Sequence, residues 1–201
     1  MKRAAAWIMA AVAAVPMAVL AHECGHVAAA MACGLRGNAL HYASATYSLE
    51  QPFWSAYRET GLDSAATVVA PWKVAVELTG GLVLPYVMVV VGIIIVARTP
   101  HPLAVATAVV PNVRSLLVAL SVAATWGRDV VRGSDEAHLA AITGIPEALL
   151  IVLGLTALIA SVFWVFARVP RRERTMSVLS TIAGIAAGMM LYFLAGPHLL
   201  P

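Results

Sequence analysis

Charged residues and cysteines are scarce in this sequence. Asp, Glu, Lys and Arg make up 11% of its 201 residues, against about 25% in a typical soluble domain. This scarcity, with a hydrophobic content of 61%, excludes a soluble globular domain and indicates a polytopic membrane protein. The net charge of +3 is no signature of nucleic-acid binding. The two cysteines, Cys24 and Cys33, are nine positions apart and do not stack on one helix face, which argues against a disulfide.

The sequence contains several long apolar stretches. A helix needs about 20 apolar residues to cross a bilayer, and five stretches meet this length. We therefore predict an all-α membrane protein of about five transmembrane helices in one domain, residues 1–201, with a metal-site core over about 4–144 and C-terminal scaffold helices over about 146–197. The five predicted spans are residues 4–33, 72–97, 103–126, 146–167 and 176–195.

A cluster of polar residues, His22-Glu23-Cys24-Gly25-His26, interrupts the first apolar stretch. Positions i and i+4 share one helix face, so His22 and His26 can direct two imidazole nitrogens at one divalent ion, a spacing that zinc sites use. Glu23 is suited to take a proton from a water molecule that the ion activates. Such side chains are costly at membrane depth and avoid lipid. The motif therefore predicts a metal site, with Cys24 pointing away from it.

Two other interpretations of this motif are possible. The pattern has three fixed positions and also occurs by chance on solvated helix faces. Residues 1–21 also have the features of a signal peptide: Lys2 and Arg3, an apolar run, and Val19-Leu20-Ala21 as a passable cleavage site. Cleavage there would leave His22 at the new N-terminus. Apolarity resumes over residues 27–33, however, and this continuity favours a membrane helix.

The segment between the first two spans is polar and rich in aromatic residues. Residues 38–49 have some β character, and the pattern allows either a membrane-associated strand or hairpin or an interfacial aromatic loop. Residues 51–63 could form a short interfacial helix.

The second and third spans carry isolated polar residues. Glu77 precedes Gly80 and Gly81, which permit close approach of another helix. We interpret Glu77 as a solvated helix start near the membrane surface, with support of a metal ligand as the alternative. Asn112 and Arg114 at mid-span should face protein or a water-filled cavity. They could bind substrate backbone or neutralise a carboxylate, and a structural interhelix hydrogen bond explains both residues at least as well.

The loop of residues 127–144 offers the best candidates for a third metal ligand. Ser134 or Asp135 can cap a short helix that ends at Gly144. Asp135 is the leading candidate ligand, with Glu136 and His138 as alternatives. Plain helix capping would equally explain Asp135.

The motif in the first helix, a second span containing Glu77-Leu78-Thr79-Gly80-Gly81, and a distant aspartate together resemble the site-2 protease family of intramembrane zinc metalloproteases. The resemblance covers about residues 4–144. It implies that His22, His26 and Asp135 bind zinc and that Glu23 activates water. It also implies that the segment 38–49 presents a substrate backbone. The chain departs from the family because Asp135 is followed by Glu136 rather than glycine, and because no regulatory domain is evident, so it resembles a minimal, divergent member.

The expected function is hydrolysis of a peptide bond in a transmembrane or membrane-near segment of a membrane protein or peptide. The alternative is a non-proteolytic metal-binding scaffold or a transporter-like protein. We expect a multi-pass protein of the cell membrane that contacts the lipid bilayer, binds no nucleic acid and has a cytoplasmic N-terminus, because seven basic residues then lie on the cytoplasmic side and five on the other. The sequence assigns no oligomeric state.

Overall fold

The computed structural model describes residues 2–41, 44–125 and 134–199. Within these ranges, five helical segments are long and apolar enough to cross a membrane. The prediction of an all-α multi-pass membrane protein is thereby confirmed for the described part of the chain. The five segments are α1 (Lys2–Ala32), α4 (Pro71–Arg98), the run from α5 to α6 (Pro102–Ala124), α8 (Glu147–Arg168) and α9 (Arg171–Leu199).

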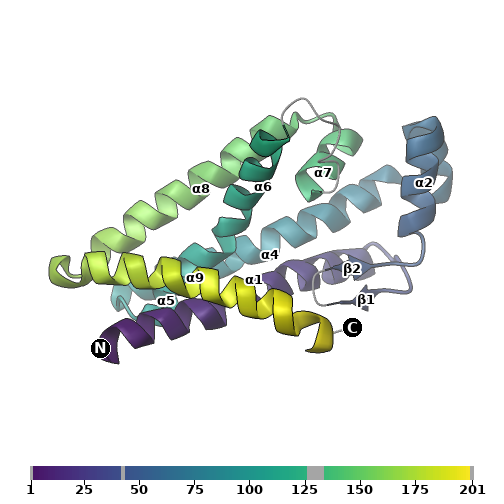
Figure 1. Ribbon diagram of the computed structural model, residues 1–201. Coiled ribbons are helices and arrows are strands. Elements are labelled where there is room, and N and C mark those ends of the chain that lie inside the picture. The colour runs from purple at the N-terminus through teal and green to yellow at the C-terminus, as the bar shows by residue number, and fades with distance from the viewer. Residues whose placement is uncertain (1, 42–43, 126–133, 200–201) are drawn as a thin grey trace.

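Helix α1 lies between α4 and α9 and contacts both (Figure 1). Glycines make these close approaches possible. A methyl group at Gly80 would come within 2.5 Å of the Gly25 carbonyl oxygen, and one at Gly184 would come within 2.5 Å of the Ile8 carbonyl oxygen. The predicted role of the glycine pair in α4 in close helix packing is thus confirmed, and α9 uses Gly188 in the same way, against Val12.

The third span is broken in the middle. It consists of α5 (Pro102–Val109), the 3-10 turn η1 (Val110–Asn112) and α6 (Val113–Ala124). Pro111 lies in η1, and proline cannot donate the backbone hydrogen bond that a continuous α-helix requires. The break ends at the start of α6, so Arg114 lies in the first turn of that helix.

A short hairpin follows α1. Strands β1 (Ala39–Leu40) and β2 (Ala45–Thr46) pair antiparallel, with Ala39 opposite Thr46. The hairpin is the first of the two predicted alternatives for this segment, although residues 42–43 at its tip lie outside the described ranges. Two helices then lead to α4: α2 (Glu50–Thr60), close to the predicted interfacial helix, and α3 (Leu62–Val68).

Helix α7 (Asp135–Thr143) comes from the predicted ligand-bearing loop. The Ser134 hydroxyl accepts a hydrogen bond from the Ala137 backbone N–H, and Gly144 ends the helix in a left-handed conformation. Both capping predictions are confirmed, with Ser134 as the N-cap. The first part of the predicted loop, residues 127–133, lies outside the described residues. Figure 1 shows α7, α2 and the hairpin at one end of the molecule and the N-terminus at the other.

Large apolar side chains cover much of the outside. Phe163 is 75% exposed and Leu153 is 58% exposed, which suits a surface in contact with lipid rather than water. Several polar side chains lie inside instead, among them Glu23, His26, Glu77 and Asn112. Burying such groups is costly unless they are paired, so this polar interior is a candidate location for a functional site.

Candidate metal centre

The rings of His22 and His26 lie on one side of α1, with a nitrogen of each ring directed toward the other. Their Nε2 atoms are 3.3 Å apart, as the spacing of four residues predicts. The Nδ1 atom of His22 donates a hydrogen bond to the Gly81 carbonyl oxygen at 2.6 Å. A carbonyl oxygen can only accept, so this contact fixes the proton on Nδ1 and leaves Nε2 as the atom available to bind an ion.

Asp135 brings a carboxylate to the same point from α7. Its Oδ2 atom lies 3.0 Å from Nε2 of His22 and 3.4 Å from Nε2 of His26. The other two candidate ligands lie elsewhere: Glu136 binds Arg114, and the His138 ring stacks on Trp54 with ring centroids 4.2 Å apart. Among the described residues, His22, His26 and Asp135 form the group that could hold a metal ion.

Glu77 supports this group from α4. The Nδ1 atom of His26 donates to Oε1 of Glu77 at 2.7 Å, and Glu77 is only 7% exposed. Our interpretation of Glu77 as a solvated helix start was wrong, and the alternative role beside a metal ligand matches its position. Glu77 lies one turn before Gly81, beside the glycines of α4 that pack against α1. Carboxylates that accept from the second nitrogen of a ligand histidine orient the ring and raise its basicity.

The two Nε2 atoms and Oδ2 of Asp135 lie so close together that their mutual repulsion must be offset. Both Nδ1 atoms donate to protein acceptors, so both Nε2 atoms direct lone pairs toward each other and toward the carboxylate of Asp135. Lone pairs repel at 3.0–3.4 Å. The arrangement is therefore stable only with positive charge between the three atoms, supplied by a proton or by a metal ion.

A cavity of about 460 Å³ opens beside these three side chains. Glu23, 6% exposed, lines it together with the candidate ligands. Apolar side chains of α9, which we had interpreted as scaffold, also contribute to its wall. The residues from α9 are Ile185, Met189 and Phe193.

Arg114 places a guanidinium in the same cavity. Its Nη2 donates to Oδ2 of Asp135 at 2.7 Å, and its Nη1 donates to Oε1 of Glu136. Of the alternatives open for Arg114, the structure shows the neutralisation of a carboxylate. Burial by itself would raise the pKa of Asp135, but its close contacts with the His22 and His26 rings and the charge of Arg114 hold that pKa well below its usual range.

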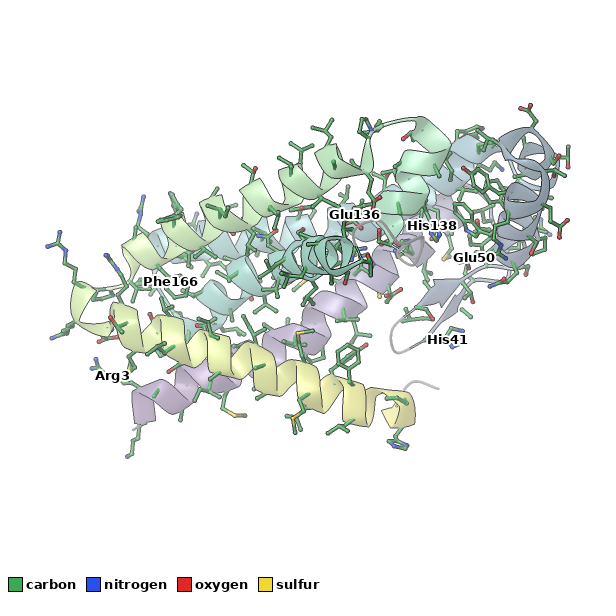
Figure 2. The ribbon with its side chains drawn as sticks, turned by 45° about the horizontal axis from the view of Figure 1, so that its top comes forward. Arg3, His41, Glu50, Glu136, His138 and Phe166 are labelled. Carbon is green, nitrogen blue, oxygen red and sulfur yellow. The ribbon has the colours of Figure 1, made fainter. Side chains whose placement is uncertain are left out.

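Glu50 lies at the start of α2, where the first cavity meets a second one of about 840 Å³. Figure 2 shows Glu50 on the same side of the molecule as His138, which lines both cavities with it. Burial raises the pKa of the Glu50 carboxyl, and the nearby charge of Glu77 raises it further. No pattern in the sequence marks Glu50, because a glutamate in the first turn of a helix is ordinary.

Asn112 occupies a different place from the proposed substrate-binding position. Its Nδ2 donates to the Ser161 hydroxyl at 3.0 Å, and it is 2% exposed. It is not among the residues that line the cavity. The structure therefore gives it the interhelix hydrogen bond that was the alternative interpretation.

Comparison with known proteins gives no relative: no protein-family model, no curated protein and no solved structure matches this chain.

Proposed function

We propose that this protein is an intramembrane zinc metalloprotease, similar to the site-2 protease family, which hydrolyses a peptide bond within or beside the membrane. The observation that carries the proposal is the convergence of His22, His26 and Asp135 beside a buried glutamate, Glu23, in one cavity. Three protein ligands, with a fourth position left for water or substrate, are the pattern of catalytic rather than structural zinc sites.

The distances among the candidate ligand atoms suit a tetrahedral ion. With zinc–ligand bonds of about 2.0–2.1 Å, ligand atoms at the corners of a tetrahedron lie about 3.3 Å apart. The three separations in this site are 3.0, 3.3 and 3.4 Å. Imidazole nitrogens with a carboxylate oxygen are also a ligand set that zinc accepts readily.

The charge of the cavity supports a divalent ion over a single proton. Four carboxylates line it, those of Glu23, Glu50, Glu77 and Asp135, against one guanidinium from Arg114, so its formal charge is −3 with neutral imidazoles. A divalent ion offsets more of that charge than one proton does, and uncompensated buried charge costs several kcal/mol per group.

Zinc bound there would act as a Lewis acid toward a peptide carbonyl and would acidify a water molecule. Glu23 would accept the proton of the attacking water and then deliver it to the leaving amine. Glu77 would hold the His26 ring in the tautomer that binds through Nε2. The apolar wall from α9 would accommodate a membrane-embedded segment whose backbone is locally unwound, since an exposed backbone in lipid must be shielded.

We place the protein in the cell membrane with its N-terminus in the cytoplasm. This orientation puts Lys2, Arg3, Arg98 and the basic residues at 168–174 on the cytoplasmic side, as the excess of positive charge in cytoplasmic loops predicts. His22, His26 and α7 then lie toward the extracytoplasmic side. Labelling of an introduced cysteine at Arg58→Cys by a membrane-impermeant maleimide in intact cells tests it. Labelling only after lysis would show the opposite orientation, with the N-terminus outside the cytoplasm.

The test of the function is cleavage of single-span membrane peptides reconstituted with the purified protein in vesicles, with new termini detected by mass spectrometry. Loss of a general base costs about 10²–10⁴-fold in rate, so Glu23→Gln should abolish detectable cleavage while keeping bound zinc. Glu59→Gln, the same change at an exposed position of α2, is the matched control and should cleave normally. Zinc bound by the native chain without any cleavage would favour the alternative, a non-proteolytic scaffold or transporter-like protein.

A further inference from the structure

Two adjacent acidic residues at the start of α7 have different partners. Asp135 directs Oδ2 at the two imidazoles, whereas Glu136, 5% exposed, directs its carboxylate at Arg114. Neighbouring residues on a helix point in directions about 100° apart. A rotation of α7 by about this angle would therefore exchange the carboxylate that faces the histidines, so the site needs a contact that fixes the rotation of the helix.

Arg114 makes contact with both carboxylates at once. One guanidinium nitrogen, Nη2, lies 2.7 Å from Oδ2 of Asp135, and the other, Nη1, donates to Glu136. A guanidinium is planar and rigid, so its two arms fix the relative position of the two acceptors, which a single lysine ammonium cannot do. The arginine itself lies in the first turn of α6, directly after the 3-10 turn.

We propose that Arg114 is a positioning residue that selects Asp135, and not Glu136, as the third metal ligand by holding α7 at one rotation about its axis. The inference rests on the metal site of the proposed function and adds a residue to it. Arg114 acts through Asp135 rather than on the ion, and Glu136 serves as the anchor of the second guanidinium arm.

Positioning and simple electrostatics predict opposite results for the loss of Arg114. A fixed positive charge close to a divalent cation repels it, so if Arg114 acted only through its charge, its removal would strengthen metal binding. If Arg114 positions Asp135, its removal weakens binding and changes the coordination geometry, as is typical when a partner of a metal ligand is lost. The sign of the change in affinity therefore separates the two roles.

The experiment is Co²⁺ titration of the full chain in detergent, followed by the visible absorption of the bound ion, with native protein, Arg114→Gln, Arg114→Lys and Arg98→Gln. We expect an affinity for Co²⁺ about 10–100-fold lower and a changed visible spectrum in both Arg114 variants. Lysine keeps the positive charge but cannot contact both carboxylates with the fixed geometry of a guanidinium. Arg98→Gln, at an exposed position at the end of α4, should match the native protein. Glu136→Gln should weaken binding less than Arg114→Gln, because an amide oxygen can still accept the hydrogen bond.

Native affinity and a native spectrum in Arg114→Lys, or tighter Co²⁺ binding in Arg114→Gln, would overturn the inference and leave Arg114 as a counter-charge. Loss of Co²⁺ in Glu136→Gln with retention in Asp135→Asn would also overturn it, because Glu136 would then be the ligand. Native protein that binds no Co²⁺ would refute the metal site itself, a result distinguishable from these outcomes.

Discussion

Gly81 is the position where a single added methyl group should destroy the metal site. Its carbonyl oxygen accepts the hydrogen bond from Nδ1 of His22, and its Cα faces the ring of His26. A Cβ at this position would lie 2.5 Å from Cε1 of His26 and closer still to Nε2. Gly81→Ala therefore sets a methyl group directly against the ligand atom.

The required displacement can be estimated from these contacts. Carbon atoms in contact normally lie about 3.5–4.0 Å apart, so the His26 ring must retreat by about 1 Å. Metal–ligand distances tolerate only about 0.2 Å, so the ring cannot retreat and remain a ligand. We expect Gly81→Ala to lower zinc affinity by at least the ~10–100-fold typical of damage to a ligand's surroundings, which is about 1.4–2.8 kcal/mol.

The assay is competition for zinc between the purified protein and a chromophoric chelator. Gly92→Ala is the matched control: it is the same change on α4, and its methyl group would come within 2.5 Å of the Ala108 backbone nitrogen in α5, away from the histidines. It should lower thermal stability but leave the zinc affinity of the folded protein unchanged. Native zinc affinity in Gly81→Ala would refute the proposed position of His26 as a ligand.

Three further predictions concern single contacts. Glu77→Ala removes the acceptor for Nδ1 of His26 and should lower zinc affinity about 10–100-fold. Glu77→Gln keeps an acceptor and should lower the affinity less. Equal zinc affinities in both variants and the native protein would contradict a role for this hydrogen bond. The pKa of Glu50 is raised in the folded protein, so ionisation of Glu50 opposes folding. The melting temperature of Glu50→Gln should therefore exceed the native one, and the difference should grow as pH rises from the ordinary pKa of glutamate through the raised value. A difference that is independent of pH would contradict the raised pKa. Ser161→Ala leaves the Asn112 amide without its partner and should destabilise the chain by about 1 kcal/mol in denaturant unfolding, with zinc affinity unchanged; altered zinc binding would instead place Asn112 in the site.

The elements of the fold were predictable because each depends on a local pattern. Apolar length alone marks the five spans, and the capping residues Ser134 and Gly144 mark α7. The pair His22 and His26 was predictable for the same reason, since the geometry of one helix fixes their separation. Glu23 follows from its place beside them.

The rest of the site depends on contacts between helices, which no local pattern encodes. Glu77 looks like an ordinary helix-start residue until α4 is packed on α1, and only that packing brings its carboxylate to His26. The choice of Asp135 over Glu136 depends on Arg114, 21 residues away in sequence. The apolar wall from α9 likewise appears only when that helix crosses α1. Long-range packing of this kind decides which polar residues meet.

The most direct measurement of the central claim is the zinc content per chain of detergent-purified protein, for the native sequence, His26→Ala, Asp135→Ala and Glu23→Gln. We predict about one zinc ion in the native protein and in Glu23→Gln, and its loss in His26→Ala and Asp135→Ala. Zinc retained in Asp135→Ala would remove that residue from the site. A native protein that binds no zinc, even after reconstitution with the ion, would contradict the metalloprotease proposal.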